Sequence, residues 1–165
     1  MLSVPFVTRL EQPTDAAAIN HLNDLAFGPG RYAKTAYRLR EGVPHDPALS
    51  FVATDGLMLI GSVRLTPIRV GEGNALLLGP LAVRPDVQKK GAGKALMAAA
   101  LDAARAGGHD LVILVGDPAY YVPLGFAPVA PGQIRLPGPV DPARLLAVPL
   151  TPAGAALSGP ARRLV

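Results

Sequence analysis

The sequence contains no cysteine and no tryptophan, and aromatic residues make up only 5% of its 165 residues. Without cysteine, the chain can form no disulfide, no thiolate metal site and no cysteine nucleophile. Its basic residues form no long stripe with interleaved aromatics, which argues against a nucleic-acid-binding face. No window approaches the roughly 20 apolar residues of a membrane span, and the N-terminus lacks a secretory signal. We therefore expect a cytoplasmic protein that binds neither membranes nor nucleic acid.

The composition is that of a chain that folds on its own. Half of the residues are apolar and 17% are charged, which is far from the composition of disordered chains. A length of 165 residues matches one ordinary domain. We expect a single domain over residues 1–165, with its core at 4–148 and a surface tail at 149–165 that is able to close over one side of a ligand site.

Hydrophobic patterns predict a mixed α/β fold. Asp55-Gly56 is a strong hairpin signal between two apolar segments. The apolar run at 111–115 follows a predicted helix, so it indicates a doubly buried strand reached by a right-handed parallel crossover. The expected strands lie at 4–10, 49–54, 57–66, 75–83, 111–115 and 145–148. The expected helices lie between Asp15 and Gly28, at 31–41, at 91–105 and around Tyr120.

Two features of this sheet bear on a ligand site. Proline cannot donate to a strand ladder and glycine weakens one, so Gly79-Pro80 predicts a bulge or splay within the strand at 75–83. The sheet is expected to be antiparallel in its first half and parallel near the helix at 91–105. The small and apolar face that we expect to dock this helix on the sheet consists of Ala92, Ala95, Leu96, Ala99 and Ala103.

A glycine- and lysine-rich turn precedes that helix. Gly91 and Gly93 allow consecutive N–H groups to converge on an anion, and the helix start adds its positive dipole end. The turn therefore predicts a site for the phosphates of a small polyanionic ligand. It is not a Walker-type loop, because Gln88 stands where that loop needs glycine, and it is not a dinucleotide fingerprint, because Leu96 stands where a third glycine is needed.

In combination, two segments resemble the GCN5-related N-acetyltransferases, the GNAT family. One is the acyl-CoA pyrophosphate loop, with Gln88-x-x-Gly91-x-Gly93 after Leu81-Ala82-Val83-x-Pro85. The other is the family's Y-x-x-x-G-F segment, which is Tyr121-Val-Pro-Leu-Gly125-Phe126 here. The pieces GPLAV, GDPAYY and VPLTP look most similar to the YhbS-like bacterial branch.

This resemblance implies a sheet opened into a V, with acetyl-CoA as the co-substrate wedged in the gap. The strand residues expected to hold the pantetheine arm are Leu81, Ala82 and Val83. The residues expected around the pyrophosphate are Gln88, Lys89, Lys90, Gly91, Ala92, Gly93 and Lys94. The resemblance also implies that a backbone N–H at the splay polarises the thioester carbonyl.

The candidate catalytic residues follow from the same resemblance. Tyr121 stands where the family commonly has a general acid beside the sulfur, although it could also be an aromatic cover for the cofactor channel; Tyr120 ranks second. The strand at 75–83 contains no acidic residue, although many members of the family have a glutamate there that acts as the general base. Asp117 is a candidate base by its place after a parallel strand, and its alternative role is a helix cap before Pro118.

We therefore predict an acetyl-CoA-dependent transfer to a primary amine of a small molecule or protein. With no cysteine and no Gly-x-Ser-x-Gly elbow, direct transfer in a ternary complex is favoured over a covalent route. Two alternatives stay open: a non-catalytic acyl-CoA-binding sensor or regulatory module, and a nucleotide phosphate binder.

The acceptor side and the assembly are less well defined by the sequence. Charged residues that hint at the acceptor side are Arg31, Arg38, Arg40 and Glu41. Glu41, His45 and Asp46 could also line the acceptor side, although isolated polar residues in a loop are usually only solvated. The three histidines have no metal-ligand spacing, so no metal is expected. An apolar C-terminal tail leaves a homodimer open.

Overall fold

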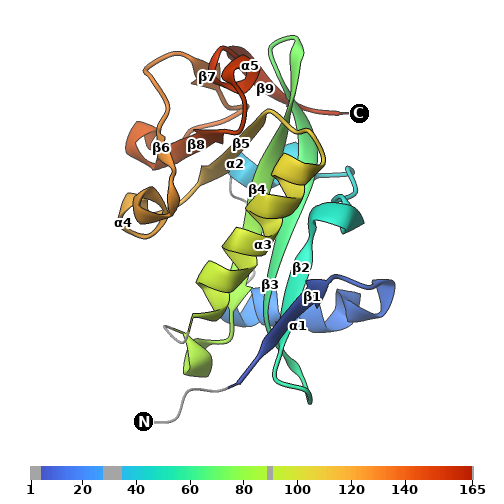
Figure 1. The fold of residues 1–165 in the computed structure, drawn as a ribbon. Helices are drawn as coiled ribbons and strands as arrows, with labels where there is room; N and C mark the ends of the chain where they lie inside the picture. Colours follow the sequence, from blue (N-terminus) through green and yellow to red (C-terminus); the bar gives the residue numbers. More distant parts are fainter. Residues whose placement is uncertain (1–4, 28–34, 89–90, 165) are drawn as a thin grey trace.

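The computed structural model describes residues 5–27, 35–88 and 91–164, and it confirms the mixed α/β fold (Figure 1). The strands are β1 Val7–Leu10, β2 Phe51–Thr54, β3 Leu59–Val70, β4 Gly73–Val83, β5 Leu111–Val115, β6 Ala127–Pro128, β7 Ile134–Arg135, β8 Leu145–Pro149 and β9 Gly159–Arg163. The helices are α1 Ala16–Phe27, α2 Thr35–Arg40, α3 Ala92–Ala106, α4 Pro118–Tyr121 and α5 Pro152–Ala155. Short 3-10 turns are η1 Pro13–Asp15, η3 Pro47–Leu49, η4 Pro85–Val87, η5 Val122–Leu124 and η6 Pro142–Arg144.

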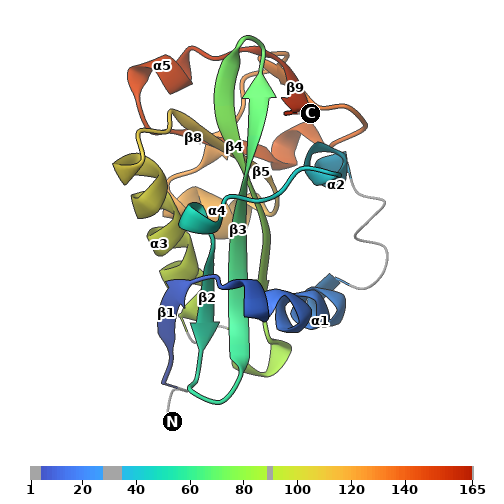
Figure 2. The same cartoon turned by 90° about the vertical axis from the view of Figure 1, so that its right-hand side faces the viewer.

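The sheet has helices on both faces. Within the described residues its strands pair in the order β1-β2-β3-β4-β5-β8-β6, antiparallel up to β4 and parallel between β4 and β5. Helix α3 covers one face, and α1 and α2 cover the other (Figure 2). Among the described helices, none combines the length and the hydrophobicity that crossing a bilayer requires.

Alternating side chains of the central strands fill a core on each face. Leu76 and Val112 pack into the cluster beneath α3, whereas Leu77 and Ile113 pack into the cluster on the opposite face. This is the two-sided burial predicted for the run at 111–115, and it follows from the two-residue period of a strand.

The buried face of α3 differs from the predicted one. The residues buried against the sheet are Ala92, Leu96, Met97, Ala100, Leu101 and Ala104, whereas the predicted Ala95, Ala99 and Ala103 are only half-buried. The helix is rotated so that its larger apolar side chains face the sheet. Burying these side chains removes more apolar area from water than burying alanines would.

The predicted disruption in β4 is confirmed at Gly79-Pro80. Leu65 of β3 pairs with Leu78, but Val63 pairs with Leu81, so a two-residue step on β3 faces a three-residue step on β4. The extra residue is a bulge. On the other side of β4, pairing with β5 is limited to two positions and stops after Leu77 and Ile113, although both strands continue. The parallel pair therefore opens into a V.

The segment at 149–165 is not a surface tail, and this expectation was wrong. Strand β9 pairs with β3 at Ile68, Arg69 and Val70, beyond the stretch of β3 that β2 covers. Ala161 of β9 is buried. A short β2 leaves the far end of β3 with an open edge, and β9 covers that edge.

Gly154 of α5 offers a test of whether the segment after Pro149 packs against the body of the protein, here against the residue that precedes β5. A Cβ at Gly154 would overlap the backbone carbonyl of Asp110, which cannot move aside as a flexible side chain can. We expect Gly154→Ala to lower the free energy of unfolding by ~1–3 kcal/mol, the range for overpacked sites, as measured by urea denaturation. Ala153→Ser, at an exposed position of the same helix, should change it by less than ~0.5 kcal/mol. An unchanged midpoint for Gly154→Ala would contradict the docking.

Candidate active site

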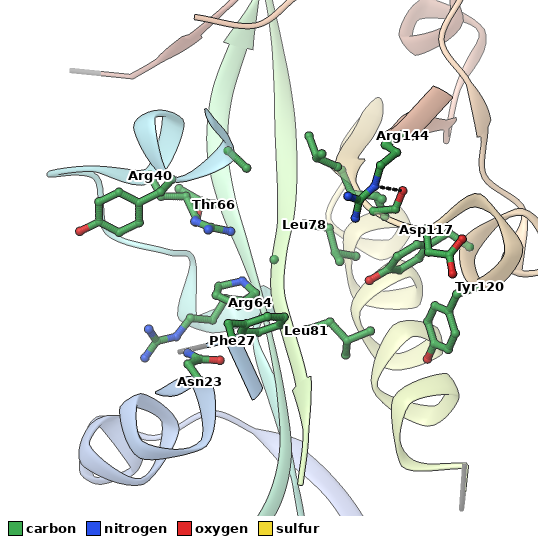
Figure 3. Close-up of a pocket in the computed structure, with 18 of the residues that line it drawn as sticks. Asn23, Phe27, Arg40, Arg64, Thr66, Leu78, Leu81, Asp117, Tyr120 and Arg144 are labelled. Carbon is green, nitrogen blue, oxygen red and sulfur yellow. Dashed lines mark hydrogen bonds between the residues drawn. The ribbon is translucent and has the colours of Figure 1, made fainter. Parts of the chain in front are cut away.

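A cleft of about 1310 Å³ lies where β4 and β5 separate (Figure 3). It exceeds the roughly 300–1,000 Å³ of sites for drug-sized ligands, so an extended ligand and a second molecule can occupy it together. One wall, which we call the α3 side, consists of the end of β4, the start of α3, the end of β5 and α4. The opposite wall, the α1 side, consists of α1, α2, the loop at 43–45 and β3.

The α3 side contains the glycine-rich turn. Gly91 adopts a left-handed conformation (φ 94°) and is the N-cap of the 15-residue helix α3. The side chain of Gln88 donates a hydrogen bond to the carbonyl of Val83 (3.2 Å), which ties the turn to the end of β4. Gly93 and Lys94 also line the cleft. A helix start at which Gly91 and Gly93 lack Cβ atoms is therefore presented to the cleft, which suits an anion site.

Not all of the predicted cofactor-binding residues reach this wall. The ones that line the cleft are Leu81, Val83, Gln88, Gly91, Gly93 and Lys94. Ala82 and Ala92 are buried, at 2% and 1% exposure, so they could offer only backbone groups. Lys89 and Lys90 lie outside the described residues.

Both tyrosines of α4 line the cleft. The hydroxyl of Tyr120 lies so close to Gly93 that a Cβ there would overlap it, and the ring of Tyr121 lies equally close to Gly116. The two rings meet edge to face with centroids 4.8 Å apart, and Tyr121 also meets Phe126 edge to face at 6.0 Å. These contacts hold Tyr121 in one orientation at the mouth of the V.

The environment keeps the Tyr121 phenol protonated. Burial, with smaller contributions from Tyr120 and Asp117, raises the pKa of Tyr121 to about 12, against a lowering effect of the Arg144 charge. Arg144 is itself held by a hydrogen bond from its Nε to the carbonyl of Gly116 (3.2 Å). The phenol can therefore donate a proton or a hydrogen bond at neutral pH.

Asp117 has the capping contact that the sequence allowed. Its Oδ1 accepts a hydrogen bond from the N–H of Ala119 (3.0 Å) at the start of α4. The residue lines the cleft, but its carboxylate is engaged in fixing the turn that carries Tyr121.

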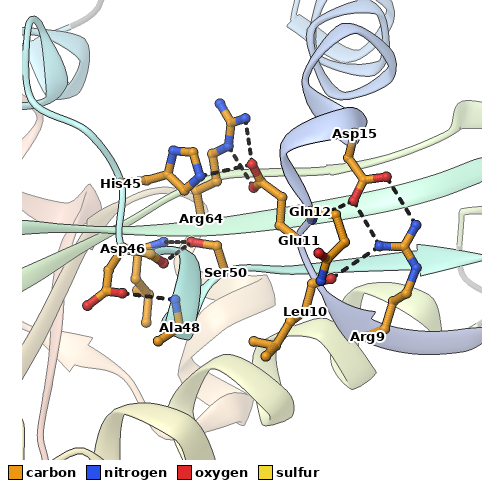
Figure 4. Close-up of polar contacts among 11 residues, drawn as sticks. Arg9, Leu10, Glu11, Gln12, Asp15, His45, Asp46, Ala48, Ser50 and Arg64 are labelled. Atoms are coloured by element: carbon orange, nitrogen blue, oxygen red, sulfur yellow. Dashed lines mark hydrogen bonds and ion pairs between the residues drawn. The ribbon is translucent and has the colours of Figure 1, made fainter.

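The α1 side contains a charged cluster that the sequence did not reveal (Figure 4). Arg64 of β3 donates two hydrogen bonds to the carboxylate of Glu11, at 2.9 and 3.0 Å, and His45 Nε2 lies 2.9 Å from the same carboxylate. Arg64 and His45 line the cleft, whereas the Glu11 side chain is only 5% exposed. The sequence left open whether His45 lines the acceptor side or is a solvated loop residue, and in the structure it lines the cleft.

Glu11 is ionised in this cluster. Burial opposes its charge, but hydrogen bonds from His45 and Arg64, together with the electrostatic interactions with these two side chains, outweigh burial and hold the pKa of Glu11 below its ordinary value. A buried carboxylate with a bidentate arginine partner satisfies its charge without water.

Only part of the predicted acceptor side is present in the cleft. Arg40 lines it, and its Nη1 lies 2.9 Å from where a Cβ on Gly79 would be, beside the bulge. Arg38 instead donates to the carbonyl of Pro137, away from the cleft. Glu41 does not line the cleft, and Arg31 lies outside the described residues.

A buried polar group on the α1 side has no hydrogen-bond partner among the described residues. Asn23 of α1 is 2% exposed, its Oδ1 accepts no hydrogen bond, and it points toward the cleft in Figure 3. A buried acceptor of this kind is normally satisfied, so a donor group of a bound molecule fits here. No cluster of three metal-ligating side chains occurs among the described residues.

Comparisons with known proteins agree with this geometry. A model of the acetyltransferase (GNAT) family matches residues 16–126. The uncharacterized N-acetyltransferase YjhQ of Escherichia coli K12 is 31% identical over 138 residues, which cover 81% of this chain and 76% of YjhQ. Escherichia coli YhbS, crystallised with CoA, matches at a TM-score of 0.82 and 27% identity, over 99% of this chain and 92% of YhbS. A Brucella melitensis GNAT acetyltransferase with acetyl-CoA matches at a TM-score of 0.62 and 29% identity, over 87% and 96%.

The chain therefore belongs to the GNAT family of N-acetyltransferases. The three relatives named above are bacterial, and two of them are crystallised with CoA or acetyl-CoA. The resemblance first indicated by the turn and the tyrosine segment is confirmed. The protein is an acetyl-CoA-dependent enzyme whose acceptor is an amine of a small molecule or a protein.

The backbone at Gly91 should matter for cofactor binding. A β-branched residue in its left-handed conformation costs about 1–3 kcal/mol, so we expect Gly91→Val to weaken CoA binding by about tenfold or more, as measured by calorimetry. Gly108→Val is the matched control: Gly108 is also left-handed with no neighbour within 4 Å, but it lies at the other end of α3. Equal losses of affinity in the two variants would contradict a role of the turn in binding.

Glu11 should contribute to the way the free energy of unfolding depends on pH in the acid range. Because folding lowers its pKa from the ordinary 4.5, its ionised form stabilises the fold above that pH, and this contribution is lost as the pH falls through the lowered value. We expect Glu11→Gln to flatten the dependence of the unfolding free energy on pH below 4.5, as measured by urea denaturation. Asp102→Asn, at an exposed position, should leave this dependence as it is in the wild type.

Proposed function

We propose that the protein transfers the acetyl group of acetyl-CoA directly to a primary amine while both substrates occupy the cleft. The loss of pairing between β4 and β5 beyond Leu77 and Ile113 carries this proposal. An open strand edge can pair with the amides of a pantetheine arm, and the start of α3 lies in the same cleft to receive the pyrophosphate. Direct transfer also suits a chain without cysteine.

The cofactor would be held mainly by backbone groups. Leu81, Ala82 and Val83 would supply the strand edge, with one backbone N–H polarising the thioester carbonyl as negative charge develops on its oxygen. The proposed pyrophosphate residues are Gln88, Lys89, Lys90, Gly91, Ala92, Gly93 and Lys94. The geometry of Gly91 and of the first turn of α3 supports this assignment.

Tyr121 is the proposed general acid. Its phenol is half-buried at the cleft, and a pKa of about 12 keeps it protonated until the thiolate leaves. Asp117 is assigned a positioning role, because its carboxylate caps the helix that carries Tyr121. We further propose that residues 1–165 act as a single cytoplasmic domain.

The release of free CoA thiol in the presence of a panel of amines tests this function. The panel should include polyamines, amino acids, aminoglycosides and peptides with free N-termini, with mass spectrometry of the acetylated product. We expect thiol release that depends on the amine. If CoA binds but no amine of a wide panel stimulates release of the CoA thiol, this result supports the non-catalytic alternative and contradicts direct transfer.

Replacing the proposed acid should affect the chemical step. We expect Tyr121→Phe to lower kcat by about 10²–10⁴-fold, the range for loss of a general acid, with KM for acetyl-CoA changed only a few-fold. Steady-state kinetics with the best acceptor of the panel measures this. Tyr120→Phe removes a hydroxyl that faces Gly93 instead, and its effect on kcat should be less than about tenfold. An unchanged kcat for Tyr121→Phe would remove Tyr121 from the mechanism.

A further inference from the structure

The cluster of Glu11, His45 and Arg64 lies beside the gap in the sheet. The N–H of Asp46 donates to the carbonyl of Leu65 at 2.8 Å, which ties the loop of His45 to β3. Arg64 is the β3 residue opposite the bulge of β4. The imidazole is thus anchored next to the point where the strands separate, on the wall opposite the pyrophosphate turn.

Few groups that line the described cleft can take a proton from an ammonium group. Among its acidic and imidazole side chains, the carboxylates of Asp117 and Asp141 each accept a backbone N–H at the start of a short helix, from Ala119 and Ala143. That leaves His45. Imidazole is the side chain whose ordinary protonation equilibrium lies closest to neutral pH, where a general base is most effective.

The contacts of His45 also assign its tautomer. The ionised carboxylate of Glu11 only accepts hydrogen bonds, so the ring nitrogen that faces it, Nε2 at 2.9 Å, carries the hydrogen. In the neutral ring, the lone pair is therefore on Nδ1. Arg64 holds both oxygens of Glu11, so the carboxylate cannot turn away from the ring.

Resting on the proposed function, we infer that His45 is the general base that deprotonates the acceptor amine, and that Glu11 is the residue that positions its ring. Nδ1 takes one proton from the acceptor ammonium and later releases it to solvent. The free amine forms a C–N bond to the thioester carbon, and the C–S bond breaks. Tyr121 gives its phenol proton to the departing CoA thiolate. The nitrogen then loses a second proton, which returns to the Tyr121 oxygen. The products are an N-acetyl amide and CoA thiol.

Several charged and titratable groups face His45. The carboxylate of Glu11 contacts its ring and is shared with Arg64, and α2 adds Arg40 and Tyr37 to the same wall. The base works only when Nδ1 is unprotonated. The rate constant kcat/KM should therefore rise with pH as His45 loses its proton.

The test compares His45→Gln with wild type across pH. Glutamine keeps an N–H donor for Glu11 but has no nitrogen that accepts a proton, so the cluster stays satisfied. At neutral pH we expect kcat to fall by about 10²–10³-fold. In this variant, kcat/KM should rise only as the acceptor ammonium itself loses its proton at alkaline pH, because only amine that is already deprotonated in solution reacts. His21→Gln, at an exposed position on α1, is the matched control and should behave as wild type.

Two further variants separate catalysis from folding. His45→Ala should regain rate when free imidazole is added, which a merely structural role would not produce. Glu11→Gln should lower kcat and move the pH limb while CoA affinity is retained, with the thermal unfolding midpoint measured alongside.

The outcomes for the two proposals are distinguishable. If wild type acetylates an amine but His45→Gln keeps its rate and its pH limb, or if imidazole rescues nothing, the role of His45 is overturned while the proposed function stands. If wild type binds CoA and acetylates no amine, both proposals fall.

Discussion

The site depends on the interrupted pairing of two parallel strands. Backbone N–H and C=O groups inside a protein must be paired, so a continuous sheet would leave nothing for a ligand to bind. Here β4 stays held by β3 on one side and β5 by β8 on the other. Each strand is therefore fixed while the edge between them remains open. The bulge at Gly79-Pro80 lies at this separation, with the Nη1 of Arg40 beside it.

The two walls of the cleft use different chemistry. The α3 side offers mostly backbone: a left-handed Gly91, the first turn of a long helix and the open edge of β4. Backbone groups suit a diphosphate and a pantetheine arm, whose polar groups are regularly spaced. The α1 side offers side chains, among them Asn23 with its unpartnered oxygen and the ring of His45. Side chains are what can distinguish one amine from another and take a proton from it.

Predictions that rested on local signals were confirmed. The hairpin at Asp55-Gly56, the bulge at Gly79-Pro80 and the strand Leu111–Val115 each follow from residues adjacent in the chain. Predictions that depended on distant packing failed. The buried face of α3 depends on which side chains the sheet can cover, and Gly159–Arg163 form the strand β9 against the open edge of β3.

By itself, the sequence determined the order of the main strands and helices from β1 to α4, the place of the splay and the glycine turn that begins α3, because each needs only the conformational limits of a few neighbouring residues. The tertiary structure alone decided which side chains meet on the α1 side of the cleft. Glu11 and Arg64 are 53 residues apart in the chain, and no local pattern relates their side chains. Charge pairing and burial bring them together with His45 only after β3 and the loop of His45 have packed. Residues adjacent in the chain thus determine the α3 side, whereas the cluster on the α1 side forms only when the protein is folded.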